Sequence, residues 1–263
     1  MKKVISISLI LLLAAFVGGC GRSKSAITLA GSTAFQPFAE KLADQYMLIH
    51  PSASITVQGG GSAVGVQSAI SGAAQIGMAD LVTLPPEARV LTSTVVAQDG
   101  IAIVVHPSNR VTDLTKQQVS GIFNGTIRNW KDAGGTNAPI TVVSREAGSG
   151  TRSSFEEILG NITLTKDALI QDSNGTIRET VANDPNAIGY LSHGLLSDRI
   201  MAIRIDHVEC TTENVVAGKY TLVRPIYLLV KGMPEGETKS FIDFILSSDG
   251  QKMIEQNGLI RAR

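Results

Sequence analysis

The chain has 263 residues, enough for one large or two medium domains, and its 23 basic and 23 acidic side chains give a formal net charge of zero. Without Lys2 and Lys3, 21 basic residues stand against 23 acidic ones, a net charge of −2. No basic stripe is available for nucleic acid or for an anionic membrane surface, so the charge pattern excludes proteins that bind either of them through basic residues.

The N-terminal segment has the pattern of a secretory signal peptide. Residues 1–19 combine two lysines, an apolar run and small residues, and Gly18 and Gly19 directly before Cys20 resemble the bacterial lipobox. This resemblance implies cleavage before Cys20, lipid on its thiol, and a lipid-anchored tether over residues 20–26. An uncleaved membrane anchor is one alternative, although the apolar stretch is shorter than the ~20 residues of a spanning helix. A soluble secreted form is the other.

The next part of the chain alternates strand and helix patterns. An apolar segment at 27–30 predicts a strand, and apolar side chains at three- and four-residue spacing predict a helix over 35–47. A second strand at 54–58 precedes a helix that ends near Gly72, and a third short strand ends just before Asp80. This alternation predicts a layered α/β fold with mainly parallel strands, in which ligands gather at the carboxyl ends of the strands.

Two nearly continuous apolar segments, at 100–105 and 225–230, predict buried strands on either side of a block of roughly 120 residues. The block has strand and helix patterns of its own. This arrangement predicts a two-lobed α/β protein, with residues 27–104 and 226–263 in the first lobe and residues 105–225 in the second. We expect a mainly parallel sheet flanked by helices in each lobe, and two crossover strands that can bend as a hinge.

Three short turns rich in glycine and hydroxyl residues, at 30–33, 59–62 and 147–151, each lead into a predicted helix. The first amides of a helix lack internal partners, glycine permits close approach, and Ser or Thr adds a hydroxyl donor. The threefold repetition predicts that these turns surround one small anion. Helix capping is the alternative for their hydroxyl residues. A fourth such turn at 173–176 is expected to cap a helix at the rim of the site.

Four stretches, at 31–37, 59–65, 76–80 and 144–151, resemble the phosphate-binding proteins of bacterial ABC phosphate transporters, which belong to the type II periplasmic-binding-protein superfamily. The Arg-x-x-Gly-Ser-Gly-Thr pattern in the last stretch is the most specific. The likeness covers essentially all of the chain after the signal peptide. The phosphate contacts that the resemblance implies are Thr33, Ser62, Asp80, Arg145, Ser149, Gly150 and Thr151, with Ser32 and Gly61 as further candidates.

The chemistry of these residue types suits a phosphate dianion that still carries one proton. Hydroxyl groups, helix-start amides and the Arg145 guanidinium are donors, and the Asp80 carboxylate is an acceptor for the ligand's proton. Sulfate has no such proton, and an unpaired buried polar group can reject a near-isostere by roughly 10⁴-fold. The alternatives are a helix cap for Asp80 and a surface ion pair for Arg145. Some relatives carry an Asp where this chain has Ala147, so Glu146 is the candidate partner of Arg145.

The resemblance implies a lipid-anchored receptor that captures inorganic phosphate between two lobes and delivers it to the permease subunits of an ABC transporter. We expect a monomer in the cell envelope, attached to the membrane through lipid on Cys20 and exposed on the periplasmic or extracellular face. No cofactor, metal ion, catalytic residue or nucleic-acid partner is expected. With Cys20 lipidated, Cys210 is expected to be a small buried hydrophobic residue.

Three other functions remain open at this point. An enzyme acting on phosphate esters is disfavoured because the chain has no P-loop motif and Ser62 does not lie in a Gly-x-Ser-x-Gly elbow. An adhesive or signalling surface protein that retains the fold is the second alternative. A receptor for another tetrahedral oxyanion, such as sulfate, tungstate or molybdate, is the third.

Overall fold

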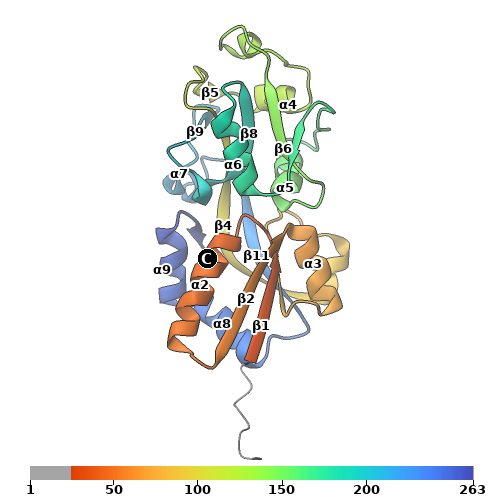
Figure 1. Cartoon of the computed structure of the whole chain (residues 1–263), viewed down its shortest axis with the longest axis vertical. Helices are drawn as coiled ribbons and strands as arrows, with labels where there is room; N and C mark the ends of the chain where they lie inside the picture. The colour runs from red at the N-terminus through yellow and green to blue at the C-terminus, as the bar shows by residue number, and fades with distance from the viewer. Residues whose placement is uncertain (1–24, 263) are drawn as a thin grey trace, which may run out of the picture.

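The computed structural model describes residues 25–262, which form an elongated α/β molecule built on one curled, mixed sheet (Figure 1). The predicted signal peptide, Cys20 and the first part of the predicted tether lie outside the described residues. The first strand begins at Ser25, two residues before the strand expected from residue 27.

The large sheet has ten strands in the described part of the chain, with the order β2-β1-β3-β11-β4-β8-β6-β7, while β9 and β12 pair with β4. A separate small sheet pairs β5 with β10. The strands are β1 (Ser25–Gly31), β2 (Ala53–Gly60), β3 (Ile76–Ala79), β4 (Leu91–Val105), β5 (Asp113–Leu114), β6 (Thr141–Arg145), β7 (Leu169–Gln171), β8 (Ala187–Ser192), β9 (Met201–Ala202), β10 (Arg204–Ile205), β11 (Val223–Lys231) and β12 (Ile260–Arg261).

Helices flank this sheet; in Figure 1, α2, α8 and α9 lie on one side of its lower part and α3 on the other. The described α-helices are α2 (Gln36–Ile49), α3 (Ser62–Ser71), α4 (Lys116–Phe123), α5 (Gly150–Ile158), α6 (Asn174–Asn183), α7 (Thr212–Val216), α8 (Gly236–Leu246) and α9 (Ser248–Gln256). The short 3-10 helices are η2 (Pro86–Val90), η3 (Trp130–Ala133) and η4 (His193–Leu195).

The helix ends follow local sequence signals. Helix α2 has Pro37 in its first turn, where the missing amide has no helical partner to lose. Helix α3 ends at Gly72, which adopts a left-handed conformation with φ of 79°, so the predicted end is confirmed. Helix α6 begins with a capping box between Ser173 and Thr176. The prediction that the 173–176 turn caps a helix is therefore also confirmed.

Buried apolar side chains form two large clusters. One draws on residues 27–97 and 226–259, and the other on residues 101–222 together with Ile260. We call these two parts the lower half (27–97 and 226–259) and the upper half (101–222), after their places in Figure 1. Cys210 is buried in the upper half, as expected, and desolvation raises the pKa of its thiol.

Strands β4 and β11 run through the boundary between the halves. Strand β4 pairs antiparallel with β11 over residues 91–100 and antiparallel with β8 over residues 101–105. The structure therefore differs from the expected separate, mainly parallel sheets: a single sheet has parallel pairs at both ends and antiparallel pairs in the middle. The apolar run at 100–105 predicted a strand correctly, but the more polar residues before it belong to the same strand.

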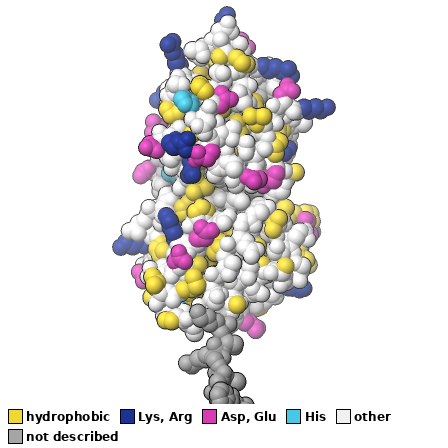
Figure 2. Space-filling view, in the orientation of Figure 1, with side chains coloured by type: hydrophobic (Ala, Val, Ile, Leu, Met, Phe, Trp, Pro, Cys, Tyr) yellow, Lys and Arg dark blue, Asp and Glu magenta, His cyan; other side chains and the backbone are white. Residues whose placement is uncertain are grey.

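One face of the molecule shows how the charged side chains are distributed. On the face in Figure 2, basic and acidic side chains are interspersed and form no continuous basic patch. Among the residues that the structure describes, no helix is both long enough and apolar enough to cross a membrane. Within the same residues, no group of three or more His, Cys, Asp or Glu side chains is arranged to hold a metal ion.

Candidate anion-binding site

The three glycine-rich turns meet between the two halves. Gly61 N donates to Gly31 O at 2.9 Å, which joins the first turn to the second, and Ala63 N donates to Gly148 O at 3.1 Å, which joins the second to the third. Gly61 has a φ of 88°, and a Cβ there would lie 2.8 Å from Gly148 O. The close approach of the upper half thus requires glycine at position 61.

Asp80 follows β3 at its carboxyl end and is almost completely buried. Ser62 Oγ donates to Asp80 Oδ1 at 2.6 Å, and Thr151 Oγ1 donates to Asp80 Oδ2 at 3.1 Å. Asp80 caps none of the described helices, because the next helical segment begins only after Pro85. The helix-cap interpretation is therefore not supported. The carboxylate instead accepts one hydrogen bond from a hydroxyl of the lower half and one from a hydroxyl of the upper half.

Arg145 ends β6, and its side chain is only 1% exposed. Its Nε and Nη2 donate to the two carboxylate oxygens of Glu146 at 2.9 and 2.8 Å, so Glu146 makes the bidentate pair expected in the absence of an Asp at position 147. Nη2 also donates to Thr33 Oγ1 at 3.2 Å. The buried Nη1 has no hydrogen-bond partner among the described residues. A surface ion pair is excluded by this burial, and the donors of Nη1 are unused by the described residues.

Two further hydroxyl groups accept hydrogen bonds and keep their own hydrogens. Thr33 Oγ1 accepts from Arg145 Nη2 and, at 3.2 Å, from Asn174 Nδ2. Ser149 Oγ is the N-cap of α5 and accepts from Arg152 N at 3.2 Å. Because a hydroxyl is also a donor, both groups can still donate to an anion. The helix-cap interpretation is therefore correct for Ser149 and does not prevent a ligand contact.

The N-terminus of α5 supplies main-chain donors. Gly150 and Thr151 are its first two residues, where amides have no intrahelical partner. A Cβ on Gly150 would lie 2.1 Å from Ser62 Oγ, so only glycine lets this helix approach the lower half. Ser32 Oγ accepts from Phe35 N at 3.0 Å and has a local capping contact.

Two residues near this site, Asp99 and Arg224, were not singled out by sequence patterns, and a third, Asn174, lies in the 173–176 turn that was predicted at the rim of the site. Asn174, in the turn that caps α6, donates through Nδ2 to Thr33 Oγ1 and, at 3.5 Å, to Thr151 Oγ1. Arg224 Nη1 lies 2.7 Å from Asp80 Oδ2, and Arg224 Nη2 donates to Asp99 Oδ2 at 2.8 Å. A signal existed, because Asp99 and Arg224 each stand just before one of the two apolar runs. Burial raises the pKa of Asp99, and the charge of Arg224 opposes this change.

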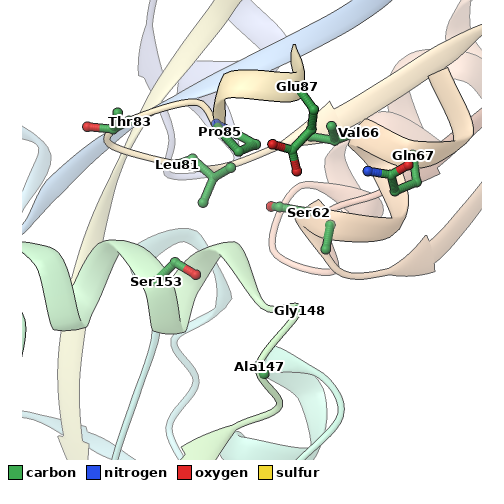
Figure 3. Close-up of a pocket in the computed structure, with 11 residues that line it drawn as sticks. Ser62, Val66, Gln67, Leu81, Thr83, Pro85, Glu87, Ala147, Gly148 and Ser153 are labelled. Carbon is green, nitrogen blue, oxygen red and sulfur yellow. The ribbon is translucent and has the colours of Figure 1, made fainter. Parts of the chain in front are cut away.

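A cavity of about 240 Å³ lies beside the site, between α3, the segment before β4 and α5. Figure 3 shows its lining, with Ser62 on the side of α3 and Ala147 and Gly148 on the opposite side. The lining includes the Glu87 carboxylate and several apolar side chains but no Arg or Lys. This composition does not suit an anion, so the cavity is distinct from the cluster around Arg145.

Comparisons with known proteins show the family of the chain. The family model described as the PBP superfamily domain matches residues 19–249. The phosphate-binding protein PstS of Bacillus subtilis is 35% identical, with 97% of this chain and 92% of the relative covered. PstS of Borreliella burgdorferi is 27% identical, with 99% of each chain covered.

Two solved structures are similar in both sequence and fold. A substrate-binding protein of a phosphate ABC transporter from Clostridium perfringens, solved with bound phosphate, is 40% identical with a TM-score of 0.88, covering 91% of this chain and 100% of the other. An ABC-type phosphate transport receptor from Vibrio cholerae is 36% identical with a TM-score of 0.75, and the match covers 90% of this chain and 100% of the receptor. The chain thus belongs to the PBP superfamily and, within it, to the PstS phosphate-binding proteins of ABC phosphate transporters.

Proposed function

We propose that this protein captures inorganic phosphate at the cluster around Arg145 and Asp80 and delivers it to the permease subunits of an ABC transporter. The observation that carries the proposal is the buried Arg145 Nη1, which has no partner among the described residues and shares the cluster with a buried carboxylate. A buried guanidinium donor without a partner is costly unless a ligand satisfies it.

The donor set around Arg145 fits a tetrahedral anion. Thr33 and Ser149 have hydroxyl hydrogens to donate, and the amides of Gly150 and Thr151 add main-chain donors at the positive end of a helix. Together with Arg145 Nη1 these groups come from both halves of the molecule. A phosphate held by them would place its oxygens against donors on several sides.

Ser62 and Thr151 require an exchange of partners. In this structure both hydroxyls donate to Asp80. A hydroxyl has a single hydrogen, so each must turn away from Asp80 to donate to the anion. Turning frees a lone pair on the carboxylate for the proton of the phosphate dianion. Asp80 then distinguishes phosphate from sulfate, tungstate and molybdate in their fully deprotonated forms.

We further propose that the two halves are lobes that close on the ligand by bending β4 and β11. Separate apolar clusters support this proposal, because each can stay packed while the boundary moves. Contacts across the boundary, such as Thr83 Oγ1 donating to Glu157 Oε1 at 2.7 Å, would form on closure. The closed form would present one defined surface to the permease.

The cellular setting follows from the family. The protein is a periplasmic or extracellular binding protein and not an enzyme, as for other PstS proteins. A lipid on Cys20, a tether over 20–26 and a monomeric state with neither cofactor nor nucleic-acid partner complete the proposal. In an adhesive or signalling protein, the buried donor Arg145 Nη1 and the buried acceptor Asp80 would have no ligand to bind.

Equilibrium dialysis of the mature chain with phosphate, and incubation with a phosphate ester, test the proposal. We expect one phosphate retained per chain and no release of phosphate from the ester. Turnover of the ester would favour a hydrolase. Absence of both retention and turnover would favour the adhesive or signalling alternative, and equal retention of sulfate would favour a general oxyanion receptor.

A further inference from the structure

Arg224 is a fully buried cation that lies behind the proposed phosphate contacts. It stands on β11 directly opposite Asp99 on β4, at the boundary between the two halves. Its Nη2 donates to Asp99 Oδ2 at 2.8 Å, and its Nη1 lies 2.7 Å from Asp80 Oδ2. One guanidinium therefore contacts two buried carboxylates, and one of these is the proposed acceptor for the ligand's proton.

Few of the described groups contact the buried Asp80 carboxylate. The carboxylate is contacted by the hydroxyls of Ser62 and Thr151 and by Arg224, and the nearby Asp99 carries a charge of the same sign. Among the described residues Arg224 is the only cation within ion-pair distance of Asp80. Burial favours the protonated form of a carboxyl group unless a cation compensates. Arg224 is therefore placed to supply this compensation.

Asp99 is in turn held from the upper half. Arg224 Nη2 and the Ser192 hydroxyl each donate to its carboxylate at 2.8 Å. Burial raises the pKa values of Cys210 and Tyr220, and the charge of Asp99 also contributes to this increase. Because Asp99 is fully buried and held on both sides, it fixes one end of the Arg224 fork. The other end of the fork, Nη1, lies 2.7 Å from Asp80 Oδ2 as an ion pair, without the geometry of a hydrogen bond.

We infer that Arg224 is a specificity-determining positioning residue, whose positive charge compensates the buried Asp80 carboxylate so that Asp80 accepts the proton of phosphate and the site rejects sulfate. This inference rests on the proposed function. A buried carboxyl group that lacks a compensating cation favours its protonated form, whose O–H can donate to a fully deprotonated oxyanion. Sulfate would then gain a hydrogen bond that the native site denies it.

The test measures the ratio of the sulfate to the phosphate dissociation constant by calorimetry at one pH and ionic strength. The main variant combines Arg224→Met with Asp99→Asn, so that Asp99 is not left as an uncompensated charge. Arg204→Met is the matched control, because Arg204 pairs with Asp113 on the surface of the upper half. Arg224→Lys restores the charge without the two-armed fork. Circular dichroism and thermal melting check that each variant folds.

We expect the control to have the wild-type ratio of the sulfate to the phosphate dissociation constant. In the double variant this ratio should be at least ~10-fold smaller, while phosphate still binds. Arg224→Lys should fall between the two. The inference is overturned if the folded double variant keeps the wild-type ratio, or if it binds neither anion, since Arg224 would then contact the ligand itself. If the double variant does not fold, the test depends on Arg224→Lys. An unchanged ratio of the two dissociation constants in Arg224→Lys then overturns the inference. Wild-type protein that does not bind phosphate would instead refute the proposed function.

Discussion

At the scale of single residues, the proposed site combines one cation with one acceptor in a buried cluster. Arg145 has two of its three nitrogens occupied by Glu146 and its neighbours, which fixes the guanidinium and leaves Nη1 for the ligand. Asp80 is held by hydroxyls from both halves. If the proposed site is correct, affinity depends mainly on Arg145 and selectivity mainly on Asp80, and the two properties should change separately.

Replacing Arg145 by Ala should weaken phosphate binding strongly. Loss of charge-assisted hydrogen bonds worth roughly 1.5–3 kcal/mol corresponds to about 10- to 150-fold in affinity. Arg178→Ala is the matched control, because Arg178 pairs with Glu179 at the surface of the upper half and such pairs contribute little. Calorimetry on both folded variants gives the comparison. An unchanged phosphate affinity in Arg145→Ala would remove Arg145 from the site.

Replacing Asp80 by Asn should reduce selectivity more than affinity. The amide has nearly the size of the carboxylate but can donate, so the repulsion of sulfate should largely disappear, whereas phosphate loses one contact among many. The measurement is the ratio of the sulfate to the phosphate dissociation constant in wild type and variant at one pH. If that ratio is the same in both proteins, Asp80 is not the selectivity element.

At the scale of elements, the N-terminus of α5 meets the N-terminus of α3 through backbone and small side chains. Gly150 allows this because a Cβ there would collide with Ser62 Oγ at 2.1 Å and with Asp80 O at 2.7 Å. The collision lies between the halves and not within one of them. Changes at this position should therefore affect the bound, closed form more than the folding of either half.

Gly150→Ala should weaken phosphate binding by about 5- to 150-fold, because overpacking of this kind costs about 1–3 kcal/mol. Gly175→Ala, near the start of α6, is the matched control, since a Cβ at this position would have Ser173 Oγ as its nearest neighbour, at an ordinary contact distance of 3.7 Å. Titration calorimetry and thermal melts of both variants provide the readout. Equal affinities for the two variants would show that α5 does not approach α3 in the bound state.

The sequence predicted most elements but not how they pair. Apolar periodicity located α2, the end of α3 and both central strands because these signals are local. The continuous sheet was not predicted because it depends on the pairing of β4 with β11 and β8. Both partner strands lie more than 80 residues further along the chain, beyond the reach of local patterns. Family motifs supplied the site residues, whereas Arg224 was missed because it sits in no motif and meets Asp80 only through the fold.

At the scale of the whole molecule, the proposed ligand contacts come from two separately packed halves. Thr33, Ser62 and Asp80 belong to the lower half, and Arg145, Ser149 and Thr151 belong to the upper half. Donors from both sides can meet one anion only when the halves approach. Binding should therefore stabilise the closed arrangement relative to open ones.

Small-angle scattering should show this change. With saturating phosphate the radius of gyration of the mature protein should be smaller than without phosphate, because the proposed bending of β4 and β11 would let the halves separate in the free protein. Arg145→Ala at the same phosphate concentration serves as the control for nonspecific effects of the salt. An identical radius of gyration in free and saturated wild type would indicate a rigid site.

The central claim is that phosphate binds between Arg145 and Asp80, and a crystal structure of the mature protein with phosphate tests it most directly. We predict one phosphate per chain, with an oxygen within hydrogen-bond distance of Arg145 Nη1 and another oxygen within hydrogen-bond distance of the Asp80 carboxylate. The hydroxyls of Thr33 and Ser149 should also contact the anion. A phosphate bound elsewhere, or one that contacts Arg145 while Ser62 and Thr151 still separate it from Asp80, would contradict the account.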